Sequence, residues 1–138
     1  MSDAAFTLDA RLDADTQQIG ELPFARVLLM NDARFPWLIL VPRISGLREL
    51  IDLAPSDQQR LLDDINRAAN ALRALEKPDK LNIAMLGNVV PQLHVHVIAR
   101  FTKDVAWPKP VWGIGERVPY AARELRRYAD EIAVALKI

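Results

Sequence analysis

The sequence lacks cysteine, has only two histidines and shows no excess of charge of either sign. The absence of cysteine excludes disulfides, thiolate nucleophiles and cysteine-ligated zinc. Eighteen basic residues balance eighteen acidic ones, so there is no electrostatic reason to bind nucleic acid or an anionic membrane. No apolar run approaches the roughly 18 residues that span a bilayer. We therefore expect neither nucleic acid nor a membrane as a partner.

The chain of 138 residues is long enough for one domain with its own core, and we expect a single domain over residues 1–138. Its first residues lack the basic start and the apolar run of a signal peptide. Together with the missing cysteines, this start favours a cytoplasmic location.

Apolar patterning predicts two strand pairs separated by one long helix and followed by a last helix. The strands are expected over 24–30 and 37–41, and over 81–85 and 92–101, each pair forming an antiparallel hairpin. Strands that are grouped in this way favour an α+β fold, in which a long helix packs on an antiparallel sheet and a C-terminal helix is added.

The long helix is expected to begin around Pro55, with Ser56 as its N-cap, and to end before Pro78. A short helix is predicted over 47–53 and the final helix over 121–136. Prolines and glycines make 102–119 an irregular loop.

The N-terminal residues 6–18 are less regular. Apolar residues alternate over 6–12, which favours a short strand, although Leu8 and Leu12 are also four apart and fit a helical turn.

The two histidines lie two residues apart, within a run of alternating polar and apolar residues. Side chains of an extended strand point alternately to its two faces, so Gln92, His94 and His96 share one face. The residues between them form an apolar face that anchors the strand. Two neutral imidazoles side by side near neutral pH make a candidate nucleophile and proton-transfer pair.

The segment from Gly87 to Arg100 resembles the signature of the histidine triad (HIT) family. In that signature three histidines alternate on a strand that follows a glycine-containing phosphate loop. The segment from Leu38 to Arg43 is similar to the family's strand that ends in Val-Pro-Lys or Val-Pro-Arg. Gln92 takes the first triad position, and His94 and His96 take the second and third.

The resemblance implies a nucleotide hydrolase or transferase that cleaves at the α-phosphate of a nucleoside phosphate derivative. His94 would attack the phosphorus, and water would hydrolyse the covalent nucleotidyl-histidine intermediate. A protonated His96 and the Gln92 amide would stabilise charge on the phosphoryl oxygens. The resemblance implies no cofactor or metal, a small-molecule nucleotide as substrate, and a homodimer.

Substrate contacts are expected from two turns. Asn31 and Asp32 lie where relatives contact the ribose, and Gly87 and Asn88 would lie beside the phosphate. All four residues also fit ordinary turns, because Asn and Asp bond their own local backbone and glycine supplies positive φ. Both interpretations stay open at this stage.

Three tryptophans bear on the candidate site, and one of them departs from the family pattern. Trp37 stands where many relatives have another histidine near the site. Trp107 and Trp112 either stack on a nucleobase or fasten the loop that contains them.

Two other functions compete with the hydrolase. Glutamine at position 92 fits a nucleotide-binding module with little or no turnover. Alternating histidines on a strand also chelate zinc, but a catalytic zinc usually takes three protein ligands. Because the chain has no third histidine and no cysteine, a metal site would need a distant carboxylate and ranks last.

Overall fold

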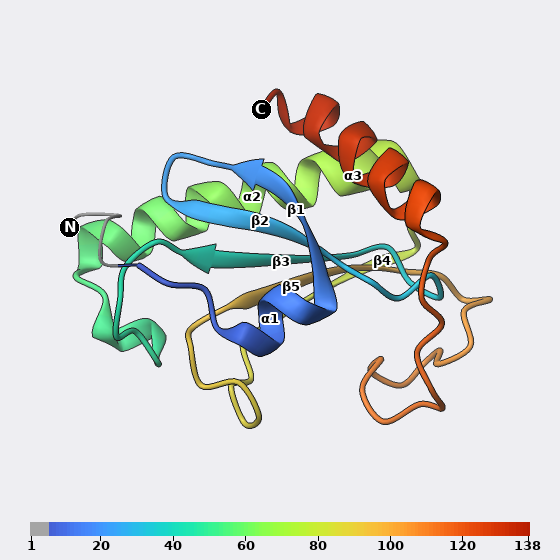
Figure 1. Ribbon diagram of the computed structural model, residues 1–138, viewed down its shortest axis with the longest axis horizontal. Coiled ribbons are helices and arrows are strands. Elements are labelled where there is room, and N and C mark those ends of the chain that lie inside the picture. The colour runs from blue at the N-terminus through green and yellow to red at the C-terminus, as the bar shows by residue number, and fades with distance from the viewer. Residues whose placement is uncertain (1–5) are drawn as a thin grey trace.

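The computed structural model describes residues 6–138. Five strands form one antiparallel sheet in the order β1-β2-β3-β5-β4. The strands are β1 (Thr16–Glu21), β2 (Ala25–Met30), β3 (Trp37–Pro42), β4 (Lys80–Ala84) and β5 (Val95–Arg100). The helices are α1 (Ala10–Asp15), the short 3₁₀ helix η2 (Leu50–Asp52), α2 (Pro55–Glu76) and α3 (Ala122–Leu136). This arrangement confirms the expected α+β class with its long helix and its C-terminal helix (Figure 1).

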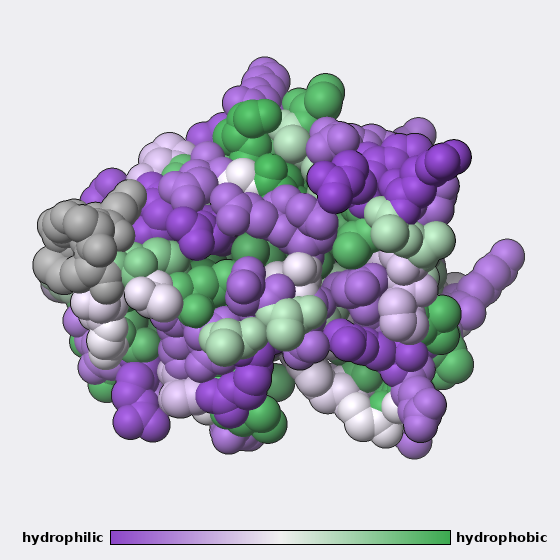
Figure 2. All heavy atoms as spheres, viewed as in Figure 1, coloured by the Kyte–Doolittle hydropathy of each residue, from purple (hydrophilic) through white to green (hydrophobic). Residues whose placement is uncertain are grey.

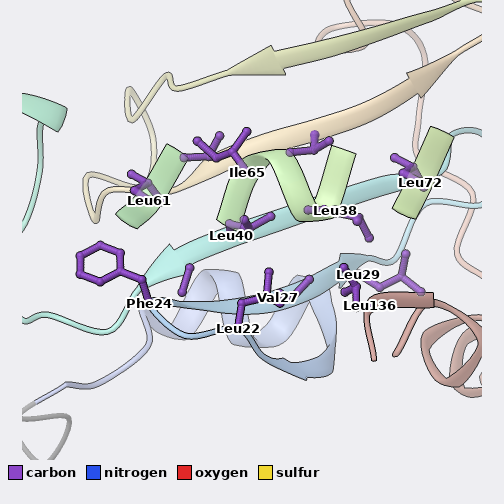
Figure 3. Packing of buried hydrophobic residues seen from close by; sticks show 14 of the residues in the cluster. Leu22, Phe24, Val27, Leu29, Leu38, Leu40, Leu61, Ile65, Leu72 and Leu136 are labelled. Carbon is purple, nitrogen blue, oxygen red and sulfur yellow. The ribbon is translucent and has the colours of Figure 1, made fainter. Parts of the chain in front are cut away.

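The main core lies between the sheet and the two long helices, α2 and α3. The buried stripe of α2 meets the strand residues that point toward it, and each fully buried leucine contributes roughly 1.5–3 kcal/mol. Alternate residues of β5 join this core. Figure 3 shows the packing of Leu22, Phe24, Val27, Leu29, Leu38, Leu40, Leu61, Ile65, Leu72 and Leu136.

A second, smaller core covers the opposite face of the sheet. Leu12 of α1 packs there, together with residues of the 102–120 loop. Strand β3 is therefore buried on both faces along its whole length, which explains its uninterrupted apolar sequence. The second core is built around Leu28, Phe35, Trp37, Ile39, Val41, Ile98, Ala106 and Val111.

The N-terminal region differs from the sequence prediction. The strand expected over 6–12 is wrong, because a helix, α1, begins at Ala10 and the strand β1 follows only at Thr16. The Asp9 carboxylate accepts a hydrogen bond from the backbone N–H of Arg11 and so caps the helix. Leu12 is buried, whereas Leu8 lies before the N-cap and outside the helix. The alternation was therefore misleading, and the four-residue spacing did not locate the helix either.

Other boundaries shift for local reasons. The N-cap of α2 is Ala54, with Pro55 at the first helical position, where its fixed φ is favourable; Ser56 is therefore not the cap. The short helix expected over 47–53 shrinks to η2. Strand β5 begins at Val95, so the strand expected over 92–101 is shorter than predicted.

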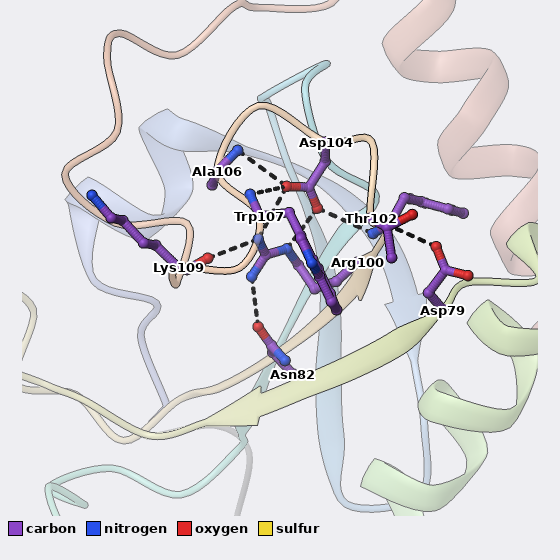
Figure 4. Close-up of polar contacts among 9 residues, drawn as sticks. Asp79, Asn82, Arg100, Thr102, Asp104, Ala106, Trp107 and Lys109 are labelled. Carbon is purple, nitrogen blue, oxygen red and sulfur yellow. Dashed lines mark hydrogen bonds and ion pairs between the residues drawn. The ribbon is translucent and has the colours of Figure 1, made fainter.

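A buried arginine fastens the irregular loop over 102–120. Arg100 ends β5, and its guanidinium donates hydrogen bonds to Asp104 Oδ2, Asn82 Oδ1 and the Lys109 carbonyl, each at 2.8 Å (Figure 4). Arg100 and Asp104 also form an ion pair in which both side chains are almost fully buried. The loop is thereby held against the second core.

Hydrophilic side chains cover most of the face shown in Figure 2, and apolar atoms appear between them as separate patches. Among residues 6–138, no helix combines the length and the apolar character that crossing a membrane requires.

Candidate active site

The two histidine rings lie together on the face of the sheet that carries the second core. His96 stands in β5, opposite Ile39 of β3, and His94 directly precedes the strand. The rings meet edge to face with 4.8 Å between their centroids. The apolar residues that alternate with them pack in the main core on the other face. The alternation predicted from the sequence is therefore confirmed.

The environment of His94 determines where its proton lies. Its Nδ1 is 2.7 Å from the backbone carbonyl oxygen of Gln92. A carbonyl only accepts, so Nδ1–H donates and the neutral ring carries its lone pair on Nε2. Nε2 has no hydrogen-bond partner among residues 6–138, in which every fully buried side-chain nitrogen is paired. Nε2 is therefore not fully buried, and its lone pair is in the form that a nitrogen nucleophile requires.

The environment of His96 directs its proton the opposite way. The indole Nε1–H of Trp37 donates to Nδ1 of His96 at 3.0 Å, so the proton of the neutral ring lies on Nε2. Burial, and then the nearby charge of a protonated His94, lower the pKa of His96 to about 3. His96 is thus neutral near pH 7 and is not the cation considered from the sequence.

Gln92 acts on its surroundings through three atoms. Its side-chain Nε2 donates to the Thr7 carbonyl at 2.9 Å, and its Oε1 accepts from the backbone N–H of Asp9 at 2.8 Å. The side chain therefore holds the N-terminal segment that leads into α1. The carbonyl that orients His94 belongs to the backbone, which a residue of any type provides.

A pocket of about 140 Å³ opens beside His94. Gly87 adopts a positive φ of 78° in its wall, and Asn88 is exposed in the same loop. Arg48 brings a cation that sequence reasoning missed, because it comes from the segment before η2, far from the histidines in sequence. The pocket is lined by Arg48, Glu49, Leu50, Met85, Leu86, Gly87, Gln92, Leu93 and His94.

One of the two loop tryptophans reaches the histidines. The Trp112 ring lies edge-on to His96 at 5.0 Å and to Trp37 at 5.8 Å. Trp107 instead lies beneath the guanidinium of Arg100, at 5.8 Å from its ring centroid. Trp112 is thus the aromatic residue of this loop that borders the site.

The structure does not bring Asn31 and Asp32 to His94. They follow β2 at the end of the sheet where the Ala99 N–H donates to the Pro36 carbonyl, and neither of them lines the pocket beside His94. Asn31 accepts a hydrogen bond from the backbone N–H of residue 120. Their contact with substrate stays a prediction.

The Asp32 carboxylate is buried and pairs with Arg34 at 2.8 Å. Burial raises the pKa of Asp32, but hydrogen bonds from Arg34 and from backbone N–H groups outweigh it and leave the pKa below its usual value. In the part of the chain that the structure describes, no group of three or more His, Asp or Glu is placed to hold a metal ion.

This sheet, with paired imidazoles and a glycine-containing loop beside them, is the arrangement of histidine triad proteins. A family model described as the HIT domain matches residues 11–103. The chain therefore belongs to the HIT family. No curated protein matches the chain.

Solved histidine triad proteins are similar over almost the whole chain. One from Bradyrhizobium japonicum is 47% identical, with a TM-score of 0.92 and coverage of 96% of this chain and 98% of that one. One from Sinorhizobium meliloti 1021 is 45% identical, with a TM-score of 0.94 and coverage of 97% and 99%. One from Marinobacter aquaeolei VT8 is 45% identical, with a TM-score of 0.92 and coverage of 96% of both chains.

Proposed function

We propose that this protein is a nucleotide hydrolase or transferase that cleaves a nucleoside phosphate derivative at its α-phosphate. His94 is the nucleophile, His96 supplies a hydrogen-bond donor, and Gln92 positions His94 through its backbone carbonyl. Gly87 and Asn88 contact the phosphate, and Asn31 and Asp32 contact the ribose. Membership of the HIT family supports the class of reaction.

The observation that carries the proposal is the hydrogen bond from His94 Nδ1 to the Gln92 carbonyl. It leaves the lone pair on Nε2, beside a pocket that ends at the glycine loop. A nearby sulfhydryl or hydroxyl nucleophile is not needed, since a neutral imidazole is itself nucleophilic near pH 7.

The reaction takes two displacements at phosphorus. His94 Nε2 forms a bond to the α-phosphorus as the bond to the ester, anhydride or phosphoramidate leaving group breaks. The leaving group takes the electron pair of that bond and a proton from solvent. Water then attacks the same phosphorus, gives up a proton to solvent, and the bond to Nε2 breaks, which returns His94 to its neutral form. Dividing the reaction in this way replaces one difficult step with two easier ones, and a transferase would use another acceptor in place of water.

The first test is nucleotide release from an adenylated lysine derivative or a diadenosine polyphosphate. We expect His94→Ala to remove activity, because no other nitrogen occupies the same position. His94→Asn is the matched variant, since it keeps a polar side chain of similar size and shows whether packing alone is responsible. Release that persists in both variants would overturn the proposal.

A nucleotide-binding module without turnover is the second candidate. It is favoured by the burial of both histidine residues, which are only 5–6% exposed, and by glutamine at position 92. A relative from Sulfolobus tokodaii, 14% identical, is described as a histidine triad nucleotide-binding protein. Calorimetry with AMP separates the candidates: binding without release of product from any substrate favours the module, and absence of binding opposes both.

We also propose that the chain is a cytoplasmic homodimer and that residues 1–138 form one domain. Strand β4 lies at an edge of the sheet, and an unpaired edge favours pairing with another strand. Exposed apolar side chains accompany this edge, and a second copy of the chain would bury them in an isologous interface. They are Leu62, Ile83, Met85 and Leu86.

A further inference from the structure

We infer that Trp37 is a positioning residue, which keeps His96 as an uncharged hydrogen-bond donor with its proton on Nε2. The inference rests on the proposed role of His94 as nucleophile. It assigns a role to Trp37, which stands where many members of the family have a histidine.

The sheet register brings Trp37 to His96. Trp37 stands opposite Ile98 and Ile39 stands opposite His96, so Trp37 and His96 are diagonal neighbours on adjacent strands. Diagonal neighbours lie roughly 7–8 Å apart, within reach of an aromatic side chain. The indole spans this gap and places Nε1 at 3.0 Å from the ring Nδ1.

The direction of this hydrogen bond is fixed by chemistry. An indole N–H donates and has no acceptor atom in the ring plane. A protonated imidazole has hydrogen on both nitrogens, so its Nδ1–H would oppose the indole N–H. The bond therefore holds only when His96 is neutral and its proton is on Nε2.

The indole has little freedom to turn away. Trp37 is 5% exposed, and its ring lies edge-on to Phe35 at 6.4 Å and to Trp112 at 5.8 Å. A ring packed from two sides keeps its rotamer, so the donor stays directed at His96.

No charge near His96 competes with this arrangement in the part of the chain that the structure describes. The strands on either side present Ile39 and Ala84 to it. Arg100 shares its face of β5 but is ion-paired with Asp104. The titratable group in contact with the ring is His94, and a charge there also disfavours protonation of His96.

The two rings therefore present opposite groups to one substrate. His94 offers a lone pair on Nε2, and His96 offers an N–H on Nε2, which has no partner within residues 6–138. In the proposed reaction the His96 N–H donates a hydrogen bond to a phosphoryl oxygen and keeps its proton. A fixed neutral donor of this kind stabilises developing charge without reorganisation.

The test is NMR of the ¹⁵N-labelled full-length protein, in which each of the two histidines gives its own set of ring nitrogen signals. We expect His96 to carry a single proton, on Nε2, from about pH 5 to 8, and the neutral form of the other ring to carry its proton on Nδ1. A coupling across the hydrogen bond should join the Trp37 Nε1 to the Nδ1 of His96. A proton on Nδ1 of His96 in the unsubstituted protein would overturn the inference, and this result needs no variant.

Trp37→Phe keeps an aromatic ring and removes the donor. We expect the coupling to vanish, His96 to take up a proton at higher pH than in the unsubstituted protein, and kcat for nucleotide release to fall about tenfold with KM changed little. Trp112→Phe is the matched control. It also replaces an indole that packs against the His96 ring, but this indole makes no hydrogen bond to His96. The control should keep the coupling and the neutral His96.

An unchanged His96 spectrum and an unchanged kcat in Trp37→Phe would contradict the inference. Failure of the proposed function is seen separately, as nucleotide release that does not depend on His94. The spectrum of the unsubstituted protein reports on Trp37 and His96 whether or not turnover occurs.

Discussion

At the scale of single residues, the site depends on where two protons lie. The Gln92 carbonyl draws the proton of His94 to Nδ1, and the Trp37 indole leaves the proton of His96 on Nε2. The spacing of the histidines was enough to predict that they share a face. Their proton positions could not be predicted, because Trp37 is 59 residues from His96 in sequence and sequence spacing does not reveal strand register.

Acid stability tests the burial of His96. Its pKa is lowered from 6.5 to about 3 in the folded protein, so between these values the unfolded chain binds the extra proton. Stability should therefore fall as pH drops through this window, by at most about 1.4 kcal/mol per pH unit for this group. Urea unfolding at several pH values measures this effect in the unsubstituted protein and in His96→Gln. The excess free energy of unfolding of the unsubstituted protein over the variant should shrink at low pH. A difference that is independent of pH would contradict the lowered pKa of His96.

Substitution of Gln92 tests whether the residue at the first triad position acts through its side chain. Gln92→Ala keeps the carbonyl that binds His94 but removes two hydrogen bonds to the N-terminal segment. We expect a loss of about 1–3 kcal/mol in the free energy of unfolding and faster amide exchange at Asp9. The ring pattern of His94 in nitrogen NMR should stay the same. A His94 proton displaced from Nδ1 would show that the amide itself orients the ring.

At the scale of elements, a buried ion pair fastens the first part of the 102–120 loop. The prolines and glycines predicted an irregular segment, and the long helices followed from their apolar stripes. The anchoring by Arg100 was not predictable, because its partners Asn82 and Lys109 come from a neighbouring strand and from the loop itself. In α1 a local contact decides the structure, because capping of the helix by Asp9 prevailed over an apparent alternation.

Removal of Arg100 should be costly. Arg100→Ala leaves the Asp104 carboxylate buried without its partner, and we expect a loss of about 3–5 kcal/mol in unfolding free energy. The exposed pair of Arg127 and Glu124 on α3 is the matched control, and Arg127→Ala should cost less than about 1 kcal/mol. Urea unfolding of both variants decides; equal losses would show that the loop does not depend on the buried pair.

At the scale of the whole molecule, the order of strands and helices carried the family prediction. The α+β class and the HIT family were predictable from periodicity and from the histidine segment. The pocket was not, since Arg48 and Gly87 meet there only through the fold.

The proposed homodimer is tested at the β4 edge. Ile83→Lys places a charge on this exposed apolar surface, and we expect the protein to sediment as a monomer, because the charge would have to be buried in the interface. Val134→Lys on α3 changes an equally apolar exposed residue away from the edge and should not alter the mass in solution. A dimer that survives Ile83→Lys would place the interface elsewhere.

The covalent intermediate on His94 is the centre of the account. The most direct measurement is the mass of the protein after reaction with a slowly hydrolysed nucleotide derivative and quenching in base, followed by peptide mapping. We predict one added nucleotidyl group, located on His94 and absent from His94→Asn. Release of product with no adduct at any time point, or an adduct on another residue, would contradict the account.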